Sequence, residues 1–382
     1  MKKLIEHHCL GDDGTSKRRN IPPQGVSTAK SVKAKHLGHD SLGCGQEETG
    51  HEWLQAAECR TTETVDPEQE YKKELHHFLT VEYGLSVKEM FPAARGFYGE
   101  TWNIQTECGN YFLKIDYWNH HKEEYQRSLS VVQYITDSGI SFVPKVIKTK
   151  EGNLYSCFGQ GIAAVFAYVP GELSENWSTE QLYSRLAEIY RLNTDGITLK
   201  TETFGTELLD TFQQLRNLSV LPAAVKKAIA DKESAISSYR ERLKKFSMIC
   251  KDDKENFHIT HGDAGGNCIL DGDQLYLVDW DSCLLAPIER DAWIFISDQD
   301  ELEKINAVLA KNQIDYRLEQ NRLCYYCYQF FFHYLNEFLK SIFDAKSERQ
   351  KAEIAESLIA YLKDCWIYQR LQAADAISCT AK

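Results

Sequence analysis

The sequence has no apolar run of the roughly 18–20 residues that a membrane-spanning helix needs. The charged start Met1-Lys2-Lys3 is followed by only two large apolar residues before Glu6, which is no signal-peptide pattern. The 12 cysteines follow no regular spacing, which argues against a disulfide framework and favours free thiols in a reducing compartment. We therefore expect a cytoplasmic protein with no membrane partner.

Basic residues are nearly missing from one part of the chain. Between residues 258 and 303 there are eleven Asp or Glu and one Arg, in a chain whose net charge is −12. Such a field repels nucleic acid and attracts cations. We therefore expect no nucleic-acid partner. The acidic band favours an amine-bearing substrate or Mg²⁺, with a solvated acidic surface as the alternative.

With 382 residues, the chain is long enough for two domains or lobes. Residues 1–65 hold few large apolar side chains, so we expect a disordered or weakly ordered extension there. Histidines and cysteines in this extension could be drawn as a zinc site, but their spacing matches no compact ligand pattern: His36, His39, Cys44, His51 and Cys59.

Hydrophobic spacing divides the rest of the chain into a β-rich part and a helical part. The first part predicts helices over residues 68–79 and 121–138, and strands over 101–106, 111–115, 143–147, 154–158 and 162–169. The second part, after residue 172, predicts helical segments over 181–192, 207–218, 222–250 and 323–343. The last of these contains Cys324-x-x-Cys327 among many aromatic residues, a pattern that predicts core packing rather than a redox site.

Residues 261–281 contain the residue types that phosphoryl transfer requires. Asp263 can lie near an attacking hydroxyl, whereas Asn267 and Asp279 can supply oxygen ligands to Mg²⁺. Two short apolar runs flank Asp271-Gly272-Asp273, which is a hairpin-turn signal. Such a hairpin would bring Asn267 and Asp279 to the same open end, although they are 12 positions apart in the sequence.

The pattern H-G-D-x-x-x-x-N, followed by D-W-D at residues 279–281, resembles that of the aminoglycoside phosphotransferase and choline kinase family. The following residues, 285–291, are most similar to the spectinomycin phosphotransferase subgroup. The resemblance is sharp over residues 258–296, weaker over 75–258 and vague after 300. It implies an α+β, bilobal protein-kinase-like fold with a small β-rich N-lobe at residues 66–169 and a larger helical C-lobe at 170–382.

The resemblance also implies roles for residues outside this block. Lys114 lies in an apolar strand on the face opposite Leu113 and Ile115, and it resembles the lysine that binds the α- and β-phosphates of the nucleotide. An edge-strand lysine that faces water is the alternative. The expected partner of Lys114 is a glutamate on the following helix, with Glu124 preferred over Glu123.

Further nucleotide contacts are predicted, some from the residues themselves and some from the same resemblance. Gly96 and Gly99 can let the backbone approach phosphates, although a plain hairpin turn explains them equally well. An apolar strand that ends in Pro-Gly-Glu implies the hinge between lobes, where adenine would bond to the backbone of Phe166, Ala167 and Tyr168. The implied cofactors are ATP, with GTP as the alternative, and Mg²⁺.

Several neighbours of the motif are interpreted as supporting residues. His261 is expected to bond to the backbone near the loop, and Asp281 to contact the metal through water. Arg290 and Asp291 resemble braces at the start of the next helix. Asp263 is the expected catalytic base.

The substrate is expected to be a small molecule with a hydroxyl group, and a cationic one. Ala286-Pro287 follows Asp279 by seven residues, which leaves no room for the peptide-docking segment of a protein kinase. The resemblance implies ATP-dependent phosphorylation of an aminoglycoside or aminocyclitol antibiotic such as spectinomycin, by a monomer or homodimer. The alternatives are a kinase of choline, homoserine or methylthioribose, and a non-catalytic binding protein of the same fold.

Overall fold

The computed structural model of the chain describes residues 67–93, 99–118, 121–174, 176–252, 256–345, 347–364 and 366–380. The described residues from Tyr71 onwards belong to one compact unit. The expectations for residues 1–65, including the zinc candidates, and for Gly96 lie outside the described residues.

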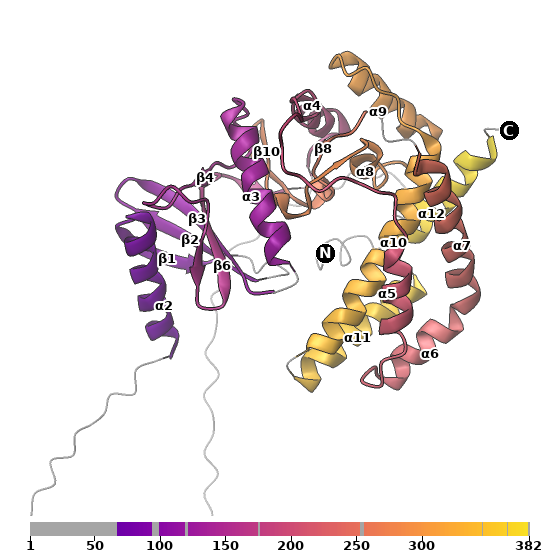
Figure 1. The fold of residues 1–382 in the computed structure, drawn as a ribbon, viewed down its shortest axis with the longest axis horizontal. Coiled ribbons are helices and arrows are strands. Elements are labelled where there is room, and N and C mark those ends of the chain that lie inside the picture. The colour runs from indigo at the N-terminus through magenta and orange to yellow at the C-terminus, as the bar shows by residue number, and fades with distance from the viewer. Residues whose placement is uncertain are drawn as a thin grey trace, which may run out of the picture. The chain divides into compact units, whose positions relative to one another are not determined.

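A six-stranded antiparallel sheet dominates the first part of this unit (Figure 1). Its strands run in the order β1-β2-β3-β6-β4, with β5 also paired to β6. The bounds are Val87–Pro92 for β1, Gly99–Thr106 for β2, Gly109–Asp116 for β3, Val146–Ile147 for β4, Ser156–Phe158 for β5 and Gly161–Ala167 for β6. Alternate residues of β3 face opposite sides, so Leu113 and Ile115 are fully buried on one face while Lys114 projects from the other.

Each face of the sheet is covered by a helix. Helix α2 (Pro67–Phe78) and the turn after it, η1 (Leu79–Tyr83), pack on the face that contains Leu113 and Ile115. Helix α3 (Lys122–Asp137) belongs to a second core, which includes Ala164 of β6 and the apolar residues of the helical part. Helix α3 therefore packs against both lobes, and a shift of α3 would disturb the packing in each of them.

The second part of the unit is helical, as predicted. Its helices are α4 (Thr179–Tyr190), α5 (Glu207–Leu215), α6 (Ala223–Asp231), α7 (Glu233–Cys250), α8 (Glu289–Ala292), α9 (Gln299–Lys311), α10 (Gln320–Asp344), α11 (Glu348–Lys363) and α12 (Trp366–Thr380). Its short strands are β7 (Glu172–Leu173), β8 (His258–Thr260), β9 (Cys268–Asp271), β10 (Gln274–Leu277) and β11 (Leu284–Ala286).

The aromatic helix α10 is the centre of this part, in contact with α5, α7, α11 and α12. Cys324 and Cys327 are buried in α10 as free thiols, which confirms the prediction of core packing. None of the helices in the described part of the chain is long and apolar enough to cross a bilayer.

The helical pattern over residues 222–250 is interrupted, so this segment forms two helices rather than one. Lys232 has φ −105° and ψ 7°, outside the helical region, and it separates α6 from α7. Helix α6 contacts α11, whereas α7 contacts α10. The break lets the two apolar faces pack against different helices, a requirement that the local spacing does not show.

A buried carboxylate joins α8 to the start of α10. Glu289 is fully buried, and its two oxygens accept hydrogen bonds from the Tyr316 hydroxyl and the Glu319 backbone N–H, both at 2.5 Å. Burial raises the pKa of Glu289 to about 7, and the two hydrogen bonds only partly oppose this. The folded state therefore holds this proton more tightly than the unfolded chain does.

This pKa shift predicts a pH-dependent stability. The stabilisation from Glu289 should be complete below the unfolded glutamate pKa of about 4.3 and lost as the pH rises towards about 7, by at most roughly 4 kcal/mol. We expect Glu289→Gln to flatten the melting temperature over this window relative to the unmodified protein. Parallel thermal melts from pH 4.5 to 8 measure this, and identical slopes for both proteins would refute it.

Candidate active site

The backbone after β8 is held by Asp291, which lies in α8. Its carboxylate accepts the backbone N–H of His261 at 3.1 Å and that of Gly262 at 2.5 Å. Gly262 has φ +83°, and a Cβ there would lie 2.3 Å from the guanidinium of Arg290, so glycine is required. Arg290 donates to the carbonyl of Ser282 at 2.6 Å. Both side chains thus brace the loop, as predicted.

His261 is buried and has a structural role. The backbone N–H of Asp263 donates to its Nδ1 at 3.2 Å, so the ring proton lies on Nε2, which donates to the Val278 carbonyl at 2.9 Å. The ring also packs against Trp280, with centroids 4.5 Å apart. Because both ring nitrogens bond to the backbone, His261 positions the segments that carry Asp263 and Asp279.

Asp263 and Asn267 lie together in the loop before β9. The Asn267 side-chain amide donates to the backbone carbonyl of Asp263 at 2.7 Å and to its carboxylate at 3.3 Å. Burial raises the pKa of Asp263 above its usual range, and the carboxylate of Asp279 adds to this. A carboxylate with a raised pKa is a better proton acceptor than an ordinary aspartate once it is ionised.

The predicted hairpin is confirmed. Strands β9 and β10 pair antiparallel, with Cys268 opposite Leu277, and the Val278 N–H donates to the Asn267 carbonyl at 3.0 Å. The position after Val278 is Asp279, so the hairpin brings Asn267 and Asp279 to one end. Asp279 has φ 64° and ψ 62°, a left-handed conformation that aspartate tolerates better than most residues and that often marks functional sites.

Lys114 extends from β3 to the segment after the hairpin, where it meets two carboxylates. Its Nζ donates to Asp279 Oδ1 at 2.5 Å and also to Asp281. Burial alone would lower the pKa of Lys114, but the two carboxylates raise it, so the amine stays charged. Lys114 therefore does not face water, which rules out the edge-strand alternative.

The two carboxylates differ in exposure. The side chain of Asp279 is 47% exposed and that of Asp281 only 11%. Burial raises the pKa of Asp281, whereas the charge of Lys114 and its hydrogen bond lower the pKa of Asp279. Sequence reasoning expected Asp281 to contact the metal through water and missed its direct contact with Lys114, which no local pattern in the sequence indicates.

The predicted ion pair between Lys114 and Glu124 is wrong in this structure. Tyr125 is fully buried and takes the position facing the sheet, with its ring centroid 5.4 Å from Lys114 Nζ. The preceding glutamates are consequently turned outwards, since neighbours on a helix point about 100° apart. Glu124 lies 3.9 Å from Lys200, and its side chain is 47% exposed.

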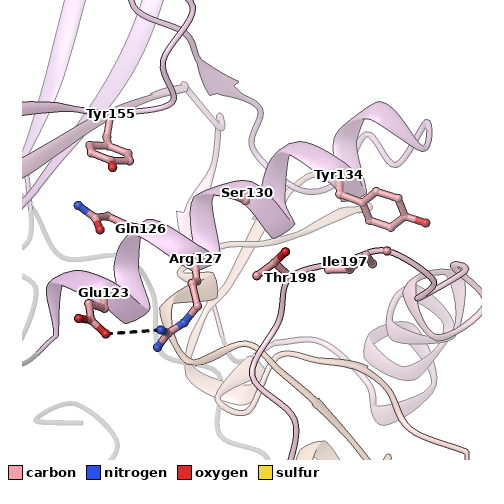
Figure 2. A pocket seen from close by; sticks show the side chains of 9 residues that line it. Glu123, Gln126, Arg127, Ser130, Tyr134, Tyr155, Ile197 and Thr198 are labelled. Atoms are coloured by element: carbon pink, nitrogen blue, oxygen red, sulfur yellow. Dashed lines mark ion pairs between the residues drawn. The ribbon is translucent and has the colours of Figure 1, made fainter.

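Glu123, the other candidate, lies on the outer face of α3, 3.7 Å from Arg127 (Figure 2). This face lines a cavity of about 580 Å³, together with Tyr155 and the loop at residues 196–198. Neither glutamate therefore lies beside Lys114.

Gly99 and the hinge residues, which the sequence predicts to contact the nucleotide, make close contacts within the protein itself. A Cβ on Gly99 would lie 1.7 Å from the Ile115 carbonyl, so glycine is needed for the close pairing of β2 with β3. At the hinge, the N–H of Ala167 donates to a carbonyl at 2.8 Å and that of Tyr168 at 3.3 Å. Because these two donors are used within the protein, an adenine would have to bond to other backbone atoms between Phe166 and the Pro-Gly-Glu segment.

The donor set fits Mg²⁺. Asp279 and Asp281 already hold a cationic group between them, and carboxylate and amide oxygens are the ligands that this hard cation prefers. The amide nitrogen of Asn267 points to Asp263, which leaves its oxygen for a metal. No cluster of three or more His, Cys, Asp or Glu suited to a metal ion occurs among the described residues, so any Mg²⁺ would also need phosphate or water ligands.

The sequence model of the phosphotransferase enzyme family, APH, matches residues 91–320. The chain belongs to this family. No curated protein matches the sequence. The chain is also similar to solved structures at low sequence identity.

Three of these structures illustrate the likeness. Spectinomycin phosphotransferase APH(9)-Ia, bound to ADP and spectinomycin, has a TM-score of 0.65 at 17% identity, covering 79% of this chain and 98% of that one. A putative aminoglycoside phosphotransferase from Ralstonia eutropha has 0.53 at 12%, covering 80% and 98%. Amicoumacin kinase hAmiN has 0.51 at 14%, covering 79% and 99%. These likenesses confirm the bilobal protein-kinase-like fold.

Proposed function

We propose that this phosphotransferase transfers the γ-phosphate of ATP to a hydroxyl group of a small molecule. The observation that carries the proposal is the contact of Lys114, from the sheet, with Asp279, from the hairpin of the helical part. Asp263 and Asn267 lie at the same end of that hairpin. A phosphate-binding lysine, a metal-binding carboxylate and a base are the groups that this reaction needs. The N-lobe is proposed to span residues 66–169 and the C-lobe 170–382.

Each residue has a proposed role in the transfer. Asp263 accepts the proton of the substrate hydroxyl while that oxygen bonds to the γ-phosphorus and the bond from phosphorus to the ADP oxygen breaks. Lys114 binds the α- and β-phosphates, and Asn267 and Asp279 would hold Mg²⁺. Bound Mg²⁺ would neutralise charge on the phosphates. Positioning and charge account for most of the rate, because little covalent work is left to the protein.

The acceptor is proposed to be a small cation, an aminoglycoside or aminocyclitol such as spectinomycin. Only the short turn η3 (Trp280–Ser282) and strand β11 separate Asp279 from α8, which is too little chain for a peptide-docking segment. The acidic band divides into acids used inside the fold, such as Glu289 and Asp291, and exposed acids at 298–300. The exposed ones remain available to attract an amine. A spectinomycin complex of a protein with the same fold supports this choice.

A salt series tests the substrate class. If exposed acids recruit a cation, the KM for spectinomycin should rise with ionic strength while kcat stays nearly constant, because salt screens exposed charges beyond roughly 8–10 Å. Release of ADP is measured at fixed free Mg²⁺, with homoserine as the neutral acceptor.

The acceptors should first be found by an ADP-release screen over aminocyclitols, aminoglycosides and small alcohol metabolites. Turnover of a neutral alcohol alone, or a KM for the antibiotic that does not change with salt, would favour a metabolite kinase instead. ATP binding that does not need Mg²⁺, with no turnover of any acceptor, would indicate a non-catalytic binding protein.

A further inference from the structure

A buried ion pair joins the end of strand β3 to the start of helix α3. Asp116 is the last residue of β3, two positions after Lys114, and it is fully buried. Its carboxylate accepts hydrogen bonds from the Trp118 backbone N–H at 2.8 Å and from Nδ1 of His121, which is 4% exposed. Burying a carboxylate is costly unless it is paired. The hydrogen bonds from Trp118 and His121 therefore offset the cost of burying the Asp116 carboxylate.

The pair lies beside the residues of the active site. His121 is the residue before α3, and its carbonyl accepts the N–H of Tyr125, one turn further on. The Tyr125 hydroxyl donates to the Lys114 carbonyl at 3.3 Å. Helix α3 also packs against η3, so that Asp281 and His121 interact electrostatically. The start of α3 is thus linked to the strand of Lys114 through the Tyr125 hydroxyl and interacts electrostatically, through His121, with Asp281.

Helix α3 is not held against Lys114 by an ion pair with a helix glutamate. Glu123 and Glu124, the candidates for such a pair, point away from the lysine. The Asp116–His121 pair makes the same connection from the backbone side, because it fixes the residue at the start of α3 to a residue two positions from the lysine.

We propose that Asp116 and His121 are positioning residues that fix α3 and Lys114 in the geometry that binds the nucleotide phosphates, in place of an ion pair between Lys114 and a helix glutamate. This inference rests on the proposed function, since it assumes that Lys114 binds phosphates. Neither residue needs to contact the nucleotide. Their effect is transmitted through the Lys114 backbone and through Tyr125.

The test compares variants that keep or remove the hydrogen bond to Asp116. An Asn side chain can place its amide nitrogen near the position of Nδ1, so His121→Asn should keep the bond, whereas His121→Leu removes it. We expect His121→Leu to raise the Kd for an ATP analogue with Mg²⁺ roughly ten- to a hundredfold, the size of effect that loss of an outer-shell partner has. His121→Asn should stay within about threefold, a small change on the same scale. Calorimetry measures the Kd and needs no acceptor substrate.

The melting temperature of every variant is measured alongside the Kd, and Glu123→Gln on the same helix is the matched control, with an unchanged Kd expected. A lower melting temperature for His121→Leu with an unchanged Kd would show a purely structural pair and overturn the proposal. If His121→Leu does not fold, the proposal is tested by comparing two single variants, His121→Asn and Asp116→Asn. The Asp116→Asn change weakens the pair, so its Kd should be higher than that of His121→Asn.

A Glu124→Gln variant that weakens nucleotide binding as much as the loss of the pair would also overturn the proposal, because the helix glutamate would then be the partner of Lys114 in the bound state. If the unmodified protein binds no nucleotide, the proposed function itself is wrong. If it binds nucleotide but phosphorylates none of the screened acceptors, only the substrate assignment fails, and the comparison of Kd values still decides the role of the pair.

Discussion

Asp263→Asn should bind ATP with Mg²⁺ normally and lose phosphoryl transfer by on the order of 10²–10⁴-fold, the contribution of a positioned base. Asparagine keeps an oxygen that can accept the Asn267 amide hydrogen bond, so the loop should keep its conformation. Burial raises the pKa of Asp263, which means that its surroundings disfavour a charged side chain. The neutral asparagine should therefore not destabilise the fold at neutral pH. The measurements are kcat on the true acceptor, the Kd for ATP and the melting temperature.

The raised pKa has a second consequence for the same residue. Asp263 must be ionised to accept a proton, so kcat/KM should fall on the acidic side at a pH above the usual aspartate pKa of about 3.9. Asp271→Asn, an exposed acid at the hairpin turn, is the matched control and should leave kcat unchanged. Near-full turnover by Asp263→Asn would show that another group accepts the proton.

Asp279→Ala should abolish Mg²⁺-dependent activity and weaken nucleotide binding. The loss in kcat should be on the order of 10³-fold, as for removal of a strong preorganised electrostatic contact. Asn267→Ala should be milder, because a carboxylate contributes more than an amide to binding a hard cation. The two variants are compared in kcat and in the Mg²⁺ concentration that gives half-maximal activity.

A control is needed because Asp279 has a positive φ of 64°, which alanine tolerates less well than aspartate or asparagine. Asp279→Asn keeps the backbone preference and removes the charge, so it separates strain from loss of the ligand. If it retained activity while Asp279→Ala did not, strain would explain the loss. A larger effect of Asn267→Ala than of either Asp279 variant would contradict the metal assignment.

The sequence was most informative where the chemistry is local. Asp263, Asn267 and Asp279 lie within one short segment, and the turn Asp271-Gly272-Asp273 with its apolar flanks determines a hairpin whatever the rest of the chain does. Alternation in β3 likewise placed Lys114 on the face opposite Leu113 and Ile115. These features depend on neighbours within a few positions, so periodicity and turn chemistry were enough to predict them.

Other features depend on contacts between distant parts of the chain, and only the tertiary structure decided them. The burial of Tyr125 sets the rotation of α3, and a change of one residue in that register decides whether Glu124 faces Lys114 or solvent. The contact of Lys114 with Asp281 joins residues 167 positions apart, which no local pattern encodes. Two acidic residues of the same band are buried and have structural roles: Asp291 accepts a hydrogen bond from the loop backbone, and Glu289 accepts one from the start of α10. Packing, and not residue type, determines which carboxylates are removed from water.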